Sequence, residues 1–244
     1  METPNTTDKQ AVGPAVSDQH RTSLLRLMTW LSPSYPVGAY TYSHGLENAV
    51  ETGVLKTVED AFAWLQGVIR FGAGQSDVVL LRHAYKAIKD NDDQALFKCA
   101  EMAEAFCGTE ELALETMAQG RAFLDITSKS WPCEAVERLI KIWPEQPAYP
   151  VVVGVAAAGH GVALEDTAVA YLHAMVANLV SALVRLVPFG QTDGQILTAR
   201  LEAVVIETAG KALKIPLEEI SNSCMMIDIS SMQHETQHTR LFRS

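Results

Sequence analysis

The chain has 244 residues, of which 48% are hydrophobic, and its 29 acidic and 19 basic side chains give a formal net charge of −10. This composition is typical of a folded globular protein and excludes a wholly disordered chain. Nucleic-acid binding relies on Lys and Arg contacts to phosphates. An acidic chain without a Lys/Arg cluster is therefore not expected to bind DNA or RNA.

The N-terminal segment and the cysteines indicate a cytoplasmic protein. Residues 1–20 are polar and lack the apolar run of a signal peptide. The four cysteines form no CxxC pair, so no disulfide framework is expected. Two uncharged stretches, 146–164 and 167–184, contain proline, glycine, histidine or asparagine, which are costly in lipid. We therefore expect buried helices there and no membrane association.

Helical periodicity dominates the chain after a polar leader, residues 1–22, that is predicted to be disordered. Thr57 and Asp60 have the spacing of a helix capping box. Proline and glycine residues separate the predicted elements. The expected helices cover about 23–31, 42–53, 57–71, 76–90, 92–106, 109–128, 132–143, 164–187, 195–209 and 216–222.

The segment after the proline-rich connector 144–150 is ambiguous. Val151–Val153 could form a buried strand, but no other segment shows the alternation of a partner strand. We therefore predict an all-α fold, a single-domain bundle of about ten helices spanning residues 23–222. Residues 223–244 are poorly patterned and are predicted to form an irregular C-terminal tail.

Two local patterns resemble catalytic motifs. The run Gly154–Gly161 is rich in glycine and alanine, but a phosphate-binding loop needs Lys and Ser or Thr where this chain has His160 and Gly161. Close helix packing is the better interpretation of the run, so no nucleotide hydrolysis is expected.

The second pattern is His234-Glu235-Thr-Gln-His238, which matches the HExxH motif of zinc proteases. Only six residues follow it and none is a metal ligand, and its flanks lack a long apolar face. A zinc hydrolase is thus kept only as an alternative to a polar tail that docks on a partner or on the chain's own body. His44 or His234 could also make the chain a nickel carrier.

Three further sets of polar residues are candidates for interaction surfaces. His44 and Glu47 share a helix face and could bind a metal, form a salt-linked pair or contact a partner. A polar stripe on the helix after Leu164 ends at Arg185 and indicates either an internal hydrogen-bond network or a self-association surface. The segment from Glu51 to Glu115 contains 12 acidic and 6 basic residues, an excess that is typical of solvated helix faces or of a docking surface for a basic partner.

Three segments in order along the chain resemble the hallmarks of the UreF family of urease accessory proteins. They are Leu31–Glu47, with the sequence LSPSYPVGAYTYSHGLE, Val184–Gln195, with VRLVPFGQTDGQ, and His234–Ser244, with HETQHTRLFRS. The resemblance covers about residues 24–244. His238 departs from the family pattern, in which that position is aromatic or variable.

The resemblance implies an all-α, dimeric protein that is not an enzyme and needs no cofactor or metal of its own. Such proteins bridge a D/H-type accessory scaffold and a G-type GTPase on apo-urease, in the complex that delivers nickel, and they regulate or recruit the GTPase without hydrolysing GTP.

Roles are carried over only to matching positions. Tyr42, His44 and Glu47 are expected at the GTPase-facing surface, and Arg185 with Gly190, Asp193 and Gly194 at or near the dimer. The tail is expected to order on meeting the scaffold through His234, Glu235, Arg240, Leu241, Phe242 and Arg243, with Leu241 and Phe242 as apolar anchors and the arginines making charge-assisted bonds.

Overall fold

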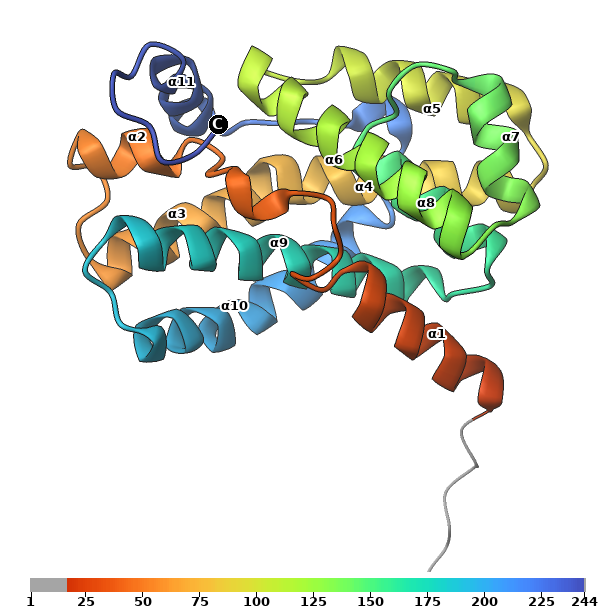
Figure 1. The fold of residues 1–244 in the computed structure, drawn as a ribbon, viewed down its shortest axis with the longest axis horizontal. Helices are drawn as coiled ribbons and strands as arrows, with labels where there is room; N and C mark the ends of the chain where they lie inside the picture. The colour runs from red at the N-terminus through yellow and green to blue at the C-terminus, as the bar shows by residue number, and fades with distance from the viewer. Residues whose placement is uncertain (1–16, 244) are drawn as a thin grey trace, which may run out of the picture.

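The computed structural model describes residues 17–243, and within that range every regular element is helical (Figure 1). This confirms the all-α prediction. The predicted leader falls mostly on residues 1–16, which lie outside the described part of the chain. The α-helices are α1 (Asp18–Trp30), α2 (Leu46–Glu51), α3 (Val58–Phe71), α4 (Ala73–Lys89), α5 (Asp93–Ala105), α6 (Glu110–Ser130), α7 (Glu134–Ile142), α8 (Tyr149–Gly159), α9 (Leu164–Leu186), α10 (Gln191–Ala212) and α11 (Met225–His234), with short 3₁₀ turns η1 (Ala39–Thr41) and η2 (Leu217–Glu219).

Helix α1 begins at Asp18, before the start predicted at Ser23. Ser17 caps it, because its hydroxyl accepts a hydrogen bond from the His20 N–H at 3.2 Å. The helix projects from the body of the molecule (Figure 1). Its C-terminal end is fixed to the body by Trp30, which is buried against the rings of Phe123 and Trp131.

The core lies around α4, which contacts α3, α5, α8, α9 and α10. Helices α4 and α8 can approach closely because Gly154 lies against the backbone of Leu81, where any Cβ would clash with the Leu81 carbonyl. The glycine and alanine run thus serves helix packing, as the sequence indicated. The valines at 151–153 are helical and fully buried, so the segment whose sequence was ambiguous is a helix and not a strand.

Capping explains several helix starts. In α3, the Asp60 N–H donates to the Thr57 hydroxyl at 3.1 Å and the Thr57 N–H donates to the Asp60 carboxylate at 2.9 Å, which confirms the predicted capping box. Helix α10 begins at Gln191 and not at 195, because the Asp193 carboxylate accepts from the Gly190 N–H at 2.9 Å and extends the helix into the predicted loop.

Helix α9 is the one element of the described chain that is long and apolar enough to cross a membrane by composition. Half of its most apolar window is buried inside the protein, and Thr167 and Tyr171 are buried with it. These are the features of a core helix, which is how the sequence was interpreted.

The C-terminal segment is more ordered than its sequence suggested. Residues 225–234 form α11, which packs on α2 and α6, and the last residues run back across the start of α2 (Figure 1). The segment predicted as a helix at 216–222 contains only η2. The fold therefore brings the C-terminal segment against α2, which lies far from it in the sequence.

Candidate functional site

The C-terminal tail is held on the body by a buried group of charged residues, which we call the tail-binding cluster. The His234 side chain is fully buried, between Glu47 of α2 and Glu111 of α6. Its Nε2 lies 3.0 Å from Glu47 Oε2, and its Nδ1 lies 2.9 Å from Glu111 Oε2. The cluster is completed by Arg240 and by the backbone N–H groups of Leu241 and Phe242.

Each ring nitrogen of His234 faces a carboxyl group, on Glu47 at one side and on Glu111 at the other. Arg240 adds a guanidinium whose Nη1 lies 3.2 Å from Glu111 Oε1. The cluster therefore sets a histidine and an arginine against two buried acidic side chains, an arrangement in which removal of one member leaves the others without their partner.

Glu47 is the acceptor that fixes the path of the tail. Its Oε1 accepts from the Leu241 N–H at 2.6 Å, and its Oε2 accepts from the Phe242 N–H at 2.9 Å as well as from His234. Charge-assisted hydrogen bonds of this kind are about twice as strong as neutral ones. A single buried carboxylate thus holds both the end of α11 and the chain seven residues beyond it.

A close backbone contact seats α11 on the turn before α2. Gly45 has φ +78°, and a Cβ at that position would lie 3.2 Å from both the Ile227 carbonyl oxygen and the Ser231 N–H nitrogen. Beside it, the buried hydroxyls of Thr109 and Ser231 are 2.7 Å apart and hydrogen-bonded. Only glycine satisfies both the left-handed backbone and the close approach of α11.

Arg185 links the second family-like segment to the same place. Its guanidinium lies over the Phe242 ring, 4.4 Å from the ring centroid, and Nη1 donates to the Tyr40 carbonyl at 3.0 Å. The backbone of Arg243 then donates to the Thr41 carbonyl at 2.8 Å. The three sequence segments that resemble one family therefore meet at one site.

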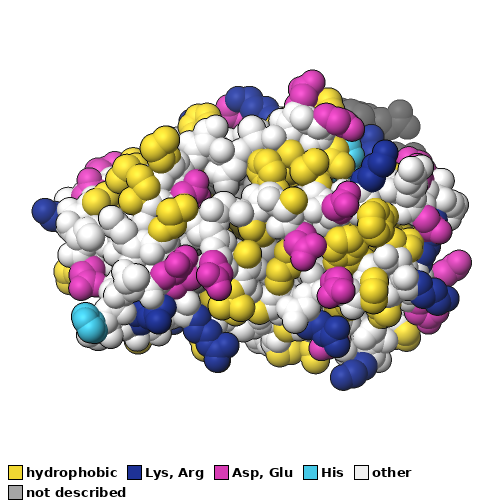
Figure 2. All heavy atoms as spheres, turned by 90° about the horizontal axis from the view of Figure 1, so that it is seen from above, with side chains coloured by type: hydrophobic (Ala, Val, Ile, Leu, Met, Phe, Trp, Pro, Cys, Tyr) yellow, Lys and Arg dark blue, Asp and Glu magenta, His cyan; other side chains and the backbone are white. Residues whose placement is uncertain are grey.

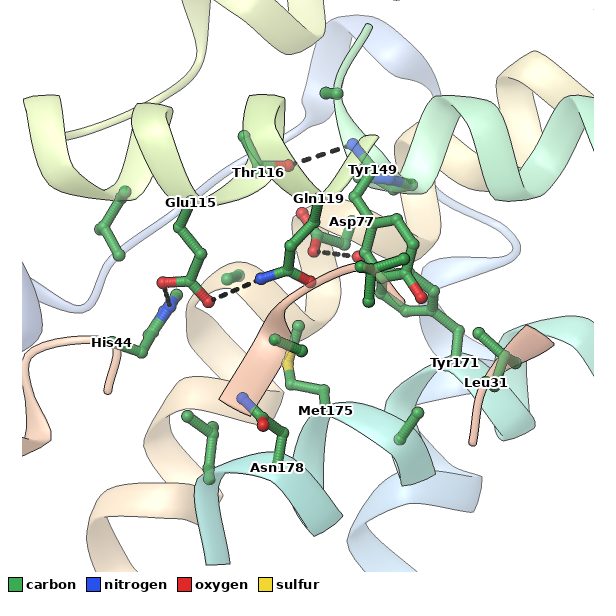
Figure 3. Close-up of a pocket in the computed structure, with 18 of the residues that line it drawn as sticks. Leu31, His44, Asp77, Glu115, Thr116, Gln119, Tyr149, Tyr171, Met175 and Asn178 are labelled. Carbon is green, nitrogen blue, oxygen red and sulfur yellow. Dashed lines mark hydrogen bonds and ion pairs between the residues drawn. The ribbon is translucent and has the colours of Figure 1, made fainter. Parts of the chain in front are cut away.

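A cavity of about 210 Å³ lies beside the tail-binding cluster, between α4, α6 and α9 (Figure 3). On one side His44 Nδ1 is 3.3 Å from Glu115 Oε2, and Gln119 donates to the other oxygen of Glu115 at 3.3 Å. On the other side the Tyr171 hydroxyl donates to Asp77 at 2.7 Å. The cavity is thus lined by buried titratable groups within an otherwise largely apolar wall.

Burial and mutual interaction shift the pKa values of these groups. Burial raises the pKa of Asp77 to about 7, although the hydrogen bond from Tyr171 and the charge of His44 act in the opposite direction. Burial alone would lower the pKa of His44, but the charge and hydrogen bond of Glu115, with smaller contributions from Asp77 and Asp228, leave it raised. These surroundings therefore favour the charged form of His44 and the neutral form of Asp77 more than water does.

The two groups of residues are joined by α6. Glu111, Glu115 and Gln119 follow one another at intervals of four residues, so they lie on one face of the helix. Glu111 binds the tail through His234, and one turn later Glu115 binds His44. Sequence analysis missed these α6 residues and Asp77. The polar stripe at helical spacing was the available signal, but an exposed helix face gives the same pattern.

The structure places the predicted site residues in three different environments. Tyr42, His44 and Glu47 are buried, and the side chains of His44 and Glu47 contact the cavity residue Glu115 and the tail rather than forming surface. Gly190, Asp193 and Gly194 start α10, where Gly194 packs against Val180 and Val184. Apart from Arg185 on α9, the remaining predicted residues lie in the tail, where His234 and Phe242 are buried while Glu235, Arg240, Leu241 and Arg243 are exposed.

The HExxH motif does not have the geometry of a metalloprotease site. Helix α11 ends at His234, so His238 is not one helical turn away on the same face, and it is exposed while His234 is buried. Both nitrogens of His234 already contact carboxylates. Across residues 17–243, no three His, Cys, Asp or Glu side chains are arranged to hold a metal ion.

Comparison with known proteins identifies the family to which the chain belongs. The UreF family model matches residues 55–202. A urease accessory protein UreF from Rhodopseudomonas palustris is 44% identical over 238 residues, which cover 98% of this chain and 99% of the relative. The chain belongs to the UreF family. Similarity extends to UreF of Bradyrhizobium diazoefficiens, 42% identical over 98% of this chain and 99% of the relative, and to UreF 1 of Brucella canis, 44% identical over 94% and 97%.

The similarity to UreF proteins includes the segments that meet at the tail-binding cluster. The relatives align over nearly the full chain, beyond the residues that the family model matches. Glu47 and the tail both lie outside the matched 55–202 range, whereas Glu111 and Arg185 lie inside it. The tail-binding cluster therefore connects the range matched by the family model with α2 before it and with the C-terminal tail after it.

Proposed function

We propose that this UreF-family chain is a non-enzymatic adaptor in urease maturation. It binds a D/H-type accessory scaffold through its C-terminal region and a G-type GTPase through the end of the molecule formed by its first family-like segment. As a cytoplasmic homodimer, it joins both to apo-urease in the complex that delivers nickel. The names of its relatives support the role in urease maturation.

The observation that carries the proposal is the docked tail and the apolar surface that it presents. Met225, Met226, Ile229 and Met232 all lie exposed on α11, at intervals that place them along one side of the helix. Figure 2 shows hydrophobic side chains gathered at the end of the molecule where α11 lies. Large exposed apolar patches mark interaction sites, and methionine-rich ones adapt to a partner's shape.

The buried cluster explains how such a surface can be presented. The charged residues beneath α11 hold the helix, and its opposite face then carries the methionines outward. The side chain of Leu241 is also exposed, while its backbone N–H donates to Glu47. In this structure the tail is ordered on its own body, so we expect the scaffold to meet a surface that is already formed.

The experiment is co-purification of the tagged chain with a D/H-type scaffold. Deleting residues 233–244 is expected to abolish binding while the helical circular dichroism stays near wild type. Met232→Asp is expected to weaken binding at least tenfold without unfolding the tail, because it puts a charge into an apolar interface. Ile140→Asp on α7, an equally exposed apolar position elsewhere, is the matched control. Full binding by both altered tails would overturn the assignment.

The hydrolase alternative has a direct test of its own. It requires stoichiometric zinc and loss of activity in Glu235→Gln. The adaptor proposal predicts that the chain purifies without stoichiometric zinc and that Glu235→Gln keeps the wild-type fold, because Glu235 is exposed at the end of α11. A nickel carrier acting alone would bind nickel through His44 or His234 at micromolar affinity or better in calorimetry. The buried ion pairs of both histidines argue against it.

A further inference from the structure

The cavity between α4, α6 and α9 has no part in the proposed adaptor function, which uses the outer surface of the tail. Its volume of about 210 Å³ exceeds the roughly 150 Å³ of an engineered protein cavity that binds benzene. A single aromatic ring with a short polar arm therefore fits inside it. Pro33, Tyr40 and Ser181 line the cavity and are also exposed at the surface, so they mark its entrance.

Most of the cavity wall is apolar. Its aliphatic and aromatic side chains include Leu31, Val37, Leu80, Phe106, Leu112 and Met175. The rings of Tyr149 and Tyr171 lie beside one another in the wall, with their centroids 5.4 Å apart. Such a wall stabilises an apolar ligand by removing its surface from water, and the faces of the aromatic rings also attract a cation.

Two hydrogen-bond acceptors in this wall have no donor within the described chain. Gln119 is only 6% exposed, and its Nε2 donates to Glu115, which turns its Oε1 away from Glu115 and into the cavity (Figure 3). Asp77 accepts from Tyr171 through one carboxyl oxygen, and no described group donates to the other. Buried polar groups are normally paired, so these two oxygens indicate a ligand that donates hydrogen bonds.

The charges around the cavity are also unbalanced. Its described lining residues include no lysine or arginine, and their one histidine, His44, is paired with Glu115. Asp77 has no ion-pair partner in the described chain, and burial raises its pKa to about 7. A bound cation restores the balance. A metal ion does not suit this role, because no three His, Cys, Asp or Glu side chains in residues 17–243 are arranged to hold one.

We propose that this cavity binds a small organic amine, whose ammonium group donates to Asp77 and Gln119 and whose apolar body, the size of one ring, lies against Tyr149 and Tyr171. An ammonium supplies both the donors that the two oxygens lack and the positive charge that Asp77 lacks. An alcohol supplies a donor without charge, and a carboxylate supplies neither. The proposal goes beyond the adaptor function, since the exposed methionines of α11 do not line the cavity.

The first test is calorimetric titration of the full-length chain at pH 8 with benzylamine, which is still protonated there. Benzyl alcohol, of the same shape without charge, and benzoate, an anion of similar size, are the comparison ligands. Benzylamine is expected to bind one molecule per chain. Benzyl alcohol should bind at least tenfold more weakly, because it cannot form a charge-assisted hydrogen bond, and benzoate should give no binding heat.

Two variants test the named residues. Asp77→Asn keeps an acceptor for Tyr171 but removes the charge, and Gln119→Met keeps the length of the side chain without Oε1. Each is expected to weaken benzylamine binding at least tenfold, with a smaller effect on benzyl alcohol. Asp90→Asn and Gln94→Met, at exposed positions, are the matched controls and should bind benzylamine as wild type does. Circular dichroism checks that all four variants keep their helices.

The dependence on pH gives a second readout. One unit below its pKa about a tenth of Asp77 is ionised, so benzylamine should bind about tenfold more weakly at pH 6 than at pH 8. His44, beside Glu115, has a raised pKa and loses its charge as pH rises, which acts in the same direction. The other titratable groups around Asp77 stay neutral in this range, because burial raises their pKa values: Tyr149, Tyr171 and Cys107. Asp77→Asn should remove most of the dependence.

Three results would overturn the proposal. They are the absence of binding heat with benzylamine, equal affinities for benzylamine and benzyl alcohol, and undiminished benzylamine binding by Asp77→Asn. Each of these leaves the tail and its scaffold binding unaffected. Failure of the amine site is therefore distinguishable from failure of the proposed function, which shows as loss of scaffold co-purification in the wild type.

Discussion

Glu47 and His234 are 187 residues apart in the sequence, and their side chains meet at 3.0 Å in the interior of the protein. The contact joins the first family-like segment to the last. It also determines the state of the tail, because the same carboxylate accepts the N–H groups of Leu241 and Phe242. The surface of α11 is consequently available only when this buried pair is formed.

We predict that Glu47→Gln loosens the tail. The substitution removes the charge that pairs with His234 and turns an amide N–H₂ toward backbone N–H groups. Breaking one side of a buried ion pair costs about 3–5 kcal/mol. Urea unfolding should show this loss, and hydrogen exchange at the amides of Leu241 and Phe242 should accelerate. Glu59→Gln, which breaks a solvent-exposed pair with Arg200, should have a much smaller effect on the unfolding free energy. Equal effects of the two variants would contradict the role of Glu47.

The two histidines of the HExxH motif should respond very differently to substitution. His234→Ala leaves Glu47 and Glu111 buried without their shared partner, so a loss of about 3 kcal/mol or more is expected. His238→Ala removes an exposed side chain and should stay within about 0.5 kcal/mol of wild type. Thermal and urea unfolding measure both. If the two histidines shared a metal site, zinc would stabilise the wild type, and both variants would lose that stabilisation equally.

Substitutions at two glycines distinguish the cost of backbone strain from the cost of disturbing the contact with the tail. Gly45 and Gly38 have nearly the same backbone, with φ +78° and +75°. Gly38→Ala meets no described atom within 4 Å, so it should cost only the left-handed conformation, about 1–2 kcal/mol. Gly45→Ala also pushes against Ile227 and Ser231 of α11 and should cost more. It should also expose the tail to protease, whereas Gly38→Ala should not. Matching protease sensitivity in the two variants would show that α11 does not rest on Gly45.

Much of the fold could be predicted from the sequence because the signals are local. The Thr57 capping box, the glycine breaks and the apolar periodicity each act within a few residues. Helix α11 escaped prediction because most of its apolar residues lie on its exposed side, whereas its buried side holds two serines and a histidine beside Ile227. That arrangement reverses the usual pattern, and it is stable only because Glu47 and Glu111 lie beneath it.

The candidate site was predicted only in part for a similar reason. Resemblance identified His44, Glu47 and the tail, but their partners Glu111, Glu115 and Asp77 carry no motif. Each of these carboxylates becomes informative only once the fold sets it against a histidine or a tyrosine. Glu47 was expected at a surface, but it is buried against His234. Local sequence could not show this, because the two residues are 187 positions apart.

The cavity predicts a specific dependence of stability on pH. Asp77 has a pKa of about 7 in the folded protein and near 4 when unfolded. Between these values the folded state binds more protons, so stability falls as pH rises from about 4 to about 7. Asp77→Asn removes this dependence and should be more stable than wild type above pH 7, because its amide oxygen still accepts from Tyr171. Urea unfolding at pH 5 and pH 8 measures the difference. A variant less stable than wild type at both values would contradict it.

His44 contributes to the same pH range with the same sign. Its pKa is raised on folding, so the stability that it provides is complete below its unfolded pKa of about 6.5 and is lost as pH rises through the folded value. His44→Gln should therefore lose more stability at pH 5.5 than at pH 9. The opposite order would show that the imidazolium is not the form bound by Glu115.

The most direct test of the account is the mass of the complex formed with a D/H-type scaffold. The tagged chain and the scaffold would be co-expressed, purified and measured by light scattering, for wild type, Glu47→Gln and Glu59→Gln. We predict a stable 2:2 assembly for wild type and Glu59→Gln, and loss of the scaffold from Glu47→Gln. Undiminished scaffold binding by Glu47→Gln, with its tail shown to be released by hydrogen exchange, would contradict the claim that the docked tail forms the binding surface.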